Sequence, residues 1–198
     1  MTLTNRMIAL AKLTLQDPRQ AARALMAEGV PIPARTAGLM LVAVLSALLA
    51  SLQIRLSPQD LDPLSALMLA SPFRAAVVQW GFLALSVVLI DRVGRAFGGT
   101  GSFADALLIV VWLQCLTLVL QILQLVASII APPLAGIIGL GGFVLFLWLM
   151  THFIVELHGF RSRGLVFAGM VLTAIAAGLI LGTALILVVG PEALMPNV

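Results

Sequence analysis

Charged residues are scarce in this chain. Only 10% of its 198 residues are Asp, Glu, Lys or Arg, whereas 62% are hydrophobic and the mean hydropathy is +1.17. An ordinary soluble domain has about 25% charged residues, so too few are present here to cover a water-exposed surface. The composition excludes a soluble globular protein and predicts a protein that crosses a membrane several times.

Features typical of several other protein classes are also missing. The single cysteine, Cys115, lies in an apolar stretch, which excludes a disulfide framework or a thiolate metal cluster within one chain. Basic patches with interleaved aromatic residues are absent, so the net charge of +3 does not indicate a nucleic-acid partner. The amphipathic N-terminal run is interrupted by Lys12 and Asp17, and we therefore expect no signal peptide.

Five long apolar segments dominate the sequence, and each has about 20 residues or more, enough to cross roughly 30 Å of hydrocarbon. We expect an all-α fold, a polytopic membrane helical bundle of five transmembrane helices preceded by short amphipathic helices. The expected spans are residues 35–54, 72–92, 104–130, 134–156 and 165–189.

The expected organisation has three parts. Residues 1–34 would form a cytoplasmic amphipathic segment, residues 35–190 the transmembrane domain, and residues 191–198 a short external tail.

Two short helices are predicted before the first span. Asp17 is a good N-cap and Pro18 suits the first helical position, while Gly29 marks the end of the second helix. Two interpretations are open for these helices. They lie in the headgroup region of the bilayer, or they pack on the ends of the spans.

The distribution of Lys and Arg predicts the orientation in the membrane. Nine of the eleven basic residues fall in the N-terminal segment, the second-to-third loop or the fourth-to-fifth loop, and only Arg55 and Arg74 lie on the other side. Short cytoplasmic loops are enriched in basic residues. We expect a cytoplasmic N-terminus and an external C-terminus. The nine residues are Arg6, Lys12, Arg19, Arg23, Arg35, Arg92, Arg95, Arg161 and Arg163.

The charged, glycine-rich break at residues 91–105 would then face the cytoplasm. Its glycines are not followed by the Lys-Ser/Thr of a phosphate-binding loop, and they follow a membrane helix where such a loop follows a strand. We therefore expect a tight turn. Ser102 would cap the third transmembrane helix together with Asp105.

This block also carries a family resemblance. Residues 94–106 read Gly-Arg-Ala-Phe-Gly-Gly-Thr-Gly-Ser-Phe-Ala-Asp-Ala, and residues 17–19 read Asp-Pro-Arg ahead of five spans. The chain resembles the bacterial branch of the Yip family, five-span proteins whose eukaryotic members are named for interacting with Ypt/Rab GTPases. The resemblance implies a multi-pass protein of the bacterial inner (plasma) membrane and brings no catalytic residues. Because the eukaryotic role is attributed to a longer cytosolic N-terminal region, no GTPase partner is implied here.

Five polar residues form a candidate functional cluster near the cytoplasmic ends of the helices. His152 and Glu156 lie one turn apart, and Asp91 and Arg95 are spaced to form an ion pair within one helix. With Asp105 they would lie at a similar depth. One interpretation is metal binding or proton handling. The other is a hydrated interface.

In a hydrated interface these groups would pair with Arg92, Arg95, Arg161 or Arg163. Two ligands do not make a metal site, so we assign no metal, no cofactor and no catalytic residue.

A second candidate feature is a polar stripe inside the membrane. Gln114, Gln121 and Gln124 are spaced to lie on one side of the third transmembrane helix. The stripe would line a path for a solute, or it would supply hydrogen bonds between helices.

Two hypotheses of function follow. The first is a non-enzymatic membrane protein that organises partners or membrane through its cytoplasmic face. The second is a small transporter or channel subunit that uses the glutamine stripe. The expected partners are the lipid bilayer and possible membrane-protein partners, including a second copy of the chain. Small residues at Ala174, Gly178 and Gly182 form a ridge that would pack within one chain or between chains.

The predicted orientation can be tested by cysteine labelling in a Cys115→Ser background. A membrane-impermeant maleimide should label Thr100→Cys only in inside-out vesicles and Ala131→Cys only in right-side-out vesicles, because positive loops stay in the cytoplasm. The reverse pattern would contradict the predicted topology.

Overall fold

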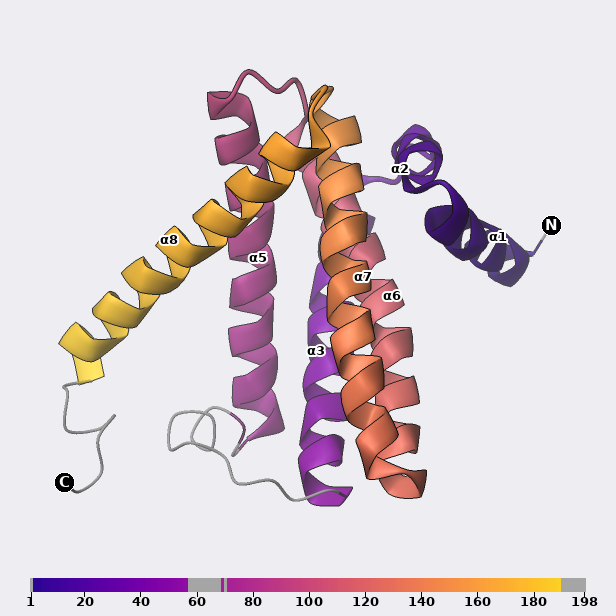
Figure 1. Ribbon diagram of the computed structural model, residues 1–198, viewed down its shortest axis with the longest axis vertical. Coiled ribbons are helices and arrows are strands. Elements are labelled where there is room, and N and C mark those ends of the chain that lie inside the picture. The colour runs from indigo at the N-terminus through magenta and orange to yellow at the C-terminus, as the bar shows by residue number, and fades with distance from the viewer. Residues whose placement is uncertain (1, 57–68, 70, 190–198) are drawn as a thin grey trace.

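The computed structural model of the chain describes residues 2–56, 69 and 71–189. Within these residues it contains seven helices and no strand, which confirms the all-α prediction (Figure 1). The expected tail at residues 191–198 lies outside the described residues. The helices are α1 (Leu3–Gln16), α2 (Pro18–Ala27), α3 (Ile32–Leu56), α5 (Pro72–Ala96), α6 (Phe103–Ile130), α7 (Pro132–His158) and α8 (Arg163–Val189).

The predicted capping residues Asp17 and Ser102 start α2 and α6. The Asp17 side chain accepts a hydrogen bond from the Gln20 backbone N–H at 3.0 Å ahead of Pro18. Ser102 accepts one from the Asp105 backbone N–H at 3.1 Å and so caps α6. These contacts satisfy N–H groups that have no partner within the helix.

Five helices, α3, α5, α6, α7 and α8, are long and apolar enough to cross a membrane, with candidate spans of 22 to 28 residues. They are longer than the apolar stretches expected from the sequence, and α7 extends two residues beyond residues 134–156 at each end. A helix of 25 residues is about 38 Å long at 1.5 Å per residue. Since the hydrocarbon core is about 30 Å thick, the helix ends extend into the headgroup region.

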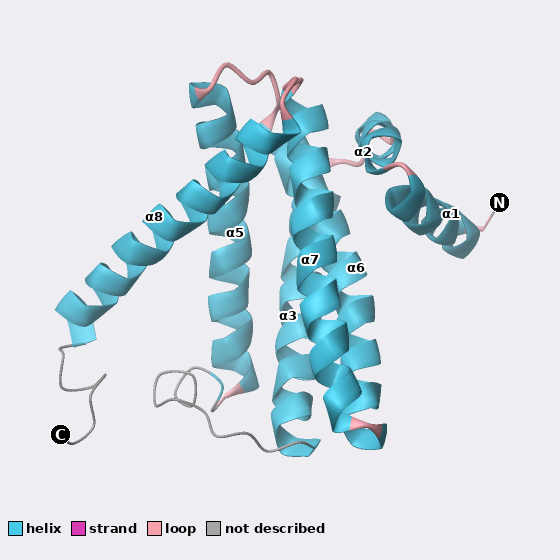
Figure 2. Cartoon of the chain, viewed as in Figure 1, coloured by secondary structure: helices cyan, strands magenta, loops and turns pink. Residues whose placement is uncertain are grey.

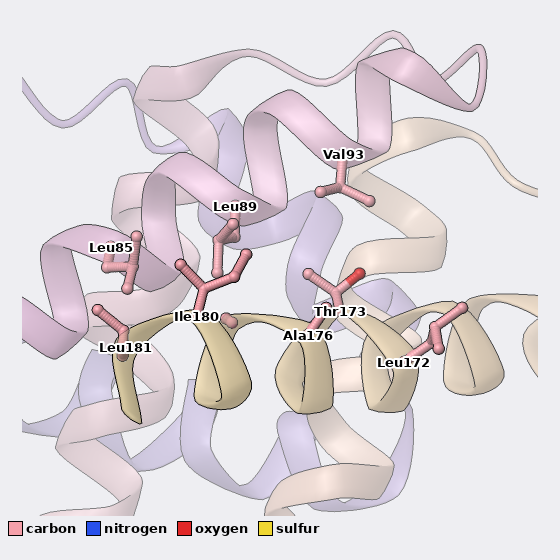
Figure 3. A pocket seen from close by; sticks show the side chains of 9 residues that line it. Leu85, Leu89, Val93, Leu172, Thr173, Ala176, Ile180 and Leu181 are labelled. Carbon is pink, nitrogen blue, oxygen red and sulfur yellow. The ribbon is translucent and has the colours of Figure 1, made fainter. Parts of the chain in front are cut away.

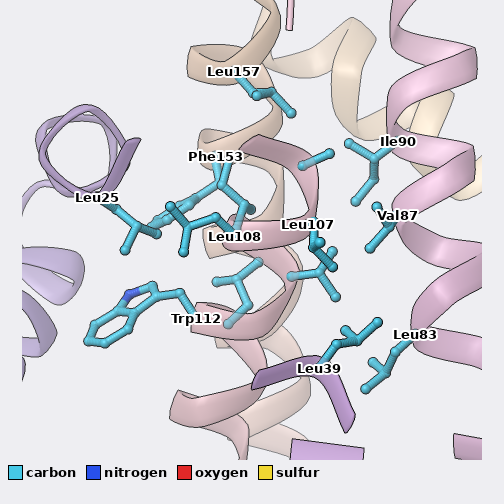
Figure 4. Close-up of a cluster of buried hydrophobic side chains, with 14 of the residues drawn as sticks. Leu25, Leu39, Leu83, Val87, Ile90, Leu107, Leu108, Trp112, Phe153 and Leu157 are labelled. Atoms are coloured by element: carbon cyan, nitrogen blue, oxygen red, sulfur yellow. The ribbon is translucent and has the colours of Figure 1, made fainter. Parts of the chain in front are cut away.

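The bundle is built around α6, which packs against α2, α3, α5 and α7 (Figures 1 and 2). Its candidate span is 44% buried within the chain, more than that of any other described helix. Figure 4 shows the core that forms between these helices. Labelled core residues include Leu25, Leu39, Val87, Leu107, Trp112 and Phe153.

The last helix, α8, has a different environment. It packs mainly on α7 and then diverges from α5 along its length (Figure 1). None of its candidate span is buried within the chain. The faces of α8 are therefore left to the bilayer or to another molecule.

The helices α1 and α2, which we call the N-terminal collar (residues 3–27), dock on the side of the bundle. α2 packs on α6 and α7 and buries Ala21, Ala22 and Leu25. At the end of α1, Thr14 is fully buried. Its hydroxyl accepts a hydrogen bond from Trp112 Nε1–H at 3.0 Å and donates to the Leu10 carbonyl at 2.8 Å.

These contacts decide between packing on the spans and lying in the headgroup region for part of the collar. α2 and the end of α1 pack on the spans. The outer face of α1 remains open, because Met7, Ile8 and Leu15 are about half exposed. An apolar face of this kind is typical of a helix that also contacts the headgroup region.

The alternating directions of the helices place the nine basic residues at one end of the bundle. We call it the basic end. It comprises the N-terminal collar, the turns at 97–102 and 159–162, and the ends of α3, α5, α6, α7 and α8 that lie beside them (Figure 1). Arg55 lies in the last turn of α3 and Arg74 in the first turn of α5, at the opposite end. The segregation of basic residues is thus a property of the folded chain.

The collar contact can be tested with a double-mutant cycle on Thr14→Val and Trp112→Phe. We expect a coupling energy of about 1 kcal/mol, because each single change breaks the same buried hydrogen bond. Reversible unfolding of the purified protein in mixed micelles measures it. Additive effects of the two substitutions would show that the bond contributes nothing to stability.

Candidate functional site

The last residue of α7, His158, is buried in a notch formed by α5 and the turn that follows it. Only 2% of its surface is exposed. A Cβ atom would lie 2.2 Å from His158 Nε2 if placed on Gly94, and 2.5 Å from Nδ1 if placed on Gly99. On Gly101 it would meet both Leu157 and the imidazole ring within 2.9 Å. These three glycines, which with the ring we call the His158 notch, are needed because no side chain fits.

Backbone groups hold both nitrogens of the imidazole. The Gly101 N–H donates to His158 Nδ1 at 3.2 Å, and Nε2 lies 3.0 Å from the Ile90 carbonyl oxygen. An N–H can only donate and a carbonyl can only accept, so Nδ1 is the acceptor and Nε2 carries the hydrogen. The ring is therefore the neutral tautomer, and it links α7 to α5 and to the turn.

Asp91 lies one residue from the carbonyl that His158 contacts. Only 1% of its surface is exposed. One oxygen, Oδ2, accepts a hydrogen bond from Arg95 and lies 3.8 Å from Arg92 Nε, whereas Oδ1 has no hydrogen-bond partner among the described residues. The structure confirms the predicted Asp91–Arg95 pair within α5 and shows that its carboxylate is buried, whereas the Arg95 side chain is half exposed.

Glu156 binds a different pair of arginines from the ones expected. In the interpretation as a hydrated interface it would pair with Arg92, Arg95, Arg161 or Arg163, and for Glu156 this part of the interpretation is wrong. Its carboxylate lies 2.8 Å from Arg19 Nε and 2.7 Å from Arg23 Nη1, both on α2. The side chain of Glu156 is only 14% exposed. The reason is tertiary, since α2 docks on this end of α7 and brings its basic face to the carboxylate.

Asp105 belongs to a separate contact between α6 and the start of α3. Arg35 lies 3.1 Å from its carboxylate and donates to the Ala104 carbonyl and, at 2.7 Å, to the Val30 carbonyl. Ser102 also donates to Asp105 at 2.6 Å. This network ties the first transmembrane helix to the cap of the third.

His152 does not interact with Glu156 through its ring. Its Nδ1 lies 2.7 Å from the Trp148 carbonyl oxygen, and the two aromatic rings are 4.8 Å apart. The five residues of the candidate cluster are therefore divided among four contacts and do not converge on one point. Within the described part of the chain, no group of three or more metal-ligating side chains occurs.

A comparison with known protein families decides where this chain belongs. The model of the Yip1 domain family matches residues 12–186, which span the end of α1, all of α2 to α7 and most of α8. The chain is a member of the Yip1 family. No curated protein and no solved structure matched the chain.

The Yip1 assignment agrees with the resemblance found in residues 94–106, and the structure gives that block a physical meaning. Gly94, Gly99 and Gly101 admit the His158 ring, while Gly98 has a φ of +84° and makes the turn. The expectation of a tight turn is confirmed. The role of the other glycines was missed, because their partner lies 57 or more residues away.

The glutamines of α6 in this Yip1 protein do not act together. Gln114 donates to Ser46 of α3 at 2.9 Å, whereas Gln124 packs on Gly139 of α7, where a Cβ would lie 2.8 Å from its Nε2. Gln121 has a buried amide oxygen without a hydrogen-bond partner among the described residues. Interhelical bonding therefore accounts for Gln114 and leaves Gln121 without a structural role.

The polar side chains of the basic end join helices to one another. Both nitrogens of His158 are bonded, Glu156 is bound by two arginines, and Asp105 is bound by Arg35. Sequence reasoning missed His158 and Arg35 as structural centres. The sequence does contain one signal of the notch, a histidine at the end of one helix together with several glycines in a distant turn.

The His158 notch predicts opposite effects for two glycines of α5. Gly94→Ala should lower the free energy of unfolding by about 1–3 kcal/mol, because the new methyl group overlaps a fixed ring. Gly81→Ala is the matched control, since nothing lies within 4 Å of its added Cβ, and it should be neutral or stabilising. Unfolding of both variants in mixed micelles measures the difference, and equal stabilities would contradict the notch.

Proposed function

We propose that this Yip1-family protein is a non-enzymatic integral membrane protein that organises partners or membrane through its cytoplasmic face. The family is not known as an enzymatic one. In this proposal the basic end is cytoplasmic, the membrane is a bacterial inner membrane, and residues 1–34, 35–190 and 191–198 are the cytoplasmic segment, the membrane domain and the external tail.

One observation carries the proposal. The Glu156 carboxylate binds Arg19 and Arg23 together and so fixes α2 of the N-terminal collar against α7. Hydrogen bonds to ionised groups are stronger than neutral ones, and two on one carboxylate define its orientation as well. A collar held in this way presents its outer surface in a constant position relative to the membrane.

That outer surface is suited to contact with another molecule. Ile8 and Leu15 expose apolar side chains beside Lys12 on α1. An exposed amphipathic surface of this kind binds headgroups or a partner helix. The possible partners are other membrane proteins or a second copy of the chain, besides the lipid bilayer.

A second candidate function, a small transporter or channel subunit, rests on Gln121. Its buried amide oxygen without a partner is what a polar path through the membrane would use. Gln114 and Gln124 face two different helices, and neither of the two grooves beside α8 is lined by a glutamine. Solute flux into vesicles containing the purified protein would favour this function over the first.

The collar proposal is tested with Glu156→Gln and with Glu28→Gln as the matched control. Glu28 forms an ion pair with Arg6, and the side chains are 41% and 55% exposed, respectively. Loss of this exposed ion pair should change the position of the collar little. Glu156→Gln should speed tryptic cleavage after Arg19 and Arg23 roughly fivefold, because about 1 kcal/mol of screened ion pairing is lost.

The functional readout is the set of adducts formed by a photocrosslinking residue placed at Ile8 in the membranes of living cells. We expect a defined set of protein or lipid adducts that is retained in Glu28→Gln and lost in Glu156→Gln. Release of the collar in Glu156→Gln with unchanged adducts would contradict the proposal.

A further inference from the structure

The divergence of α8 from α5 creates an apolar groove that runs along the membrane. It comprises two adjoining hollows of about 410 and 720 Å³. Figure 3 shows Leu85, Leu89 and Val93 of α5 on one wall and Thr173 and Ile180 of α8 on the other. We call this space the α5–α8 groove.

Small residues on α8 give the groove its depth. Ala174, Ala177 and Gly178 line it, and nothing lies within 4 Å of a Cβ added at Gly178. Two members of the ridge predicted from the sequence, Ala174 and Gly178, therefore face the groove and do not pack closely on a helix of the same chain. The volume of each hollow falls within the roughly 300–1,000 Å³ of small-molecule sites.

The groove has a polar mouth at the basic end. Arg161 and Ser162, in the turn before α8, line it there together with Phe160. Arg161 is exposed and has no carboxylate partner among the described residues, whereas Arg19, Arg23 and Arg35 are each paired. A cation without a counter-ion therefore lies at the open end of an apolar space.

We propose that the α5–α8 groove binds an anionic glycerophospholipid, with an acyl chain between α5 and α8 and the phosphate at Arg161. An apolar space inside a bilayer is filled by hydrocarbon, since nearly all of its lining is apolar and cannot hold water. The guanidinium group matches phosphate oxygens in pairs, and basic pockets between membrane helices bind anionic headgroups.

The charge at the mouth favours this occupant over a second copy of the chain. An α8 helix from another molecule would fill the apolar part but would bring no phosphate to Arg161. The site is distinct from the N-terminal collar, which docks on α6 and α7, and the proposal does not depend on the function proposed above.

The headgroup contact is tested by native mass spectrometry of the full-length protein. Delipidated protein is mixed with palmitoyl-oleoyl phosphatidylglycerol or with the phosphatidylcholine of the same chains. We expect one tightly retained phosphatidylglycerol and a preference over phosphatidylcholine of about tenfold, because the choline cation of phosphatidylcholine offsets the negative charge that Arg161 attracts.

Arg161→Gln should abolish this preference. Arg163→Gln is the matched control, because it removes the same charge two residues away without lining the groove. Equal losses in the two variants would show that surface charge alone attracts the lipid and would overturn the site.

The acyl-chain contact is tested separately with Ala177→Phe, which should displace both lipids from the groove. Ala168→Phe is its control, since Ala168 lies nine residues earlier, on the opposite side of α8, and lines neither hollow. Unchanged retention in Ala177→Phe would overturn the proposal. A dimer lost in Ala177→Phe, with no lipid retained by the wild-type protein, would assign the groove to a second copy and overturn it as well.

Discussion

The arrangement of the basic end depends on one close approach, that of the His158 ring to three glycines. The imidazole occupies space that any Cβ at Gly94, Gly99 or Gly101 would fill. The ring forms hydrogen bonds with the Gly101 N–H and the Ile90 carbonyl. These backbone groups are buried, and leaving them without partners would cost free energy. The contact fixes where α5 ends relative to α7.

Other polar contacts join further helices at the basic end. Arg35 joins the start of α3 to the cap of α6, and Glu156 joins α7 to the collar. Each uses a charged group near the membrane surface, where water is close enough to lower the cost of burial and apolar packing holds the partners in place. Together they make one end of the bundle polar and cross-linked, whereas the candidate spans themselves are apolar.

Rigidity at the basic end contrasts with the open packing of α8. The helix is held on α7 beside the turn at 159–162 and leaves α5 farther along, so the same turn that follows His158 also sets the angle of the groove (Figure 1). Polar cross-links and the lipid-facing groove therefore meet at residues 158–162.

The sequence by itself determined the helices and the contacts within each helix. Long apolar segments, the caps at Asp17 and Ser102, and the i, i+4 spacing of Asp91 and Arg95 require only neighbours along the chain, and they predicted the five membrane helices and that ion pair. The resemblance in residues 94–106 likewise predicted the family.

Only the tertiary structure decided the partners. Glu156 meets Arg19 and Arg23 across more than 130 residues, and Gly101 meets His158 across 57. Helical spacing does not predict such pairs. It shows on which face of a helix a side chain lies, but not which other helix packs on that face. The same holds for the ridge on α8. Its small residues predicted close packing between helices, but two of them, Ala174 and Gly178, line a groove.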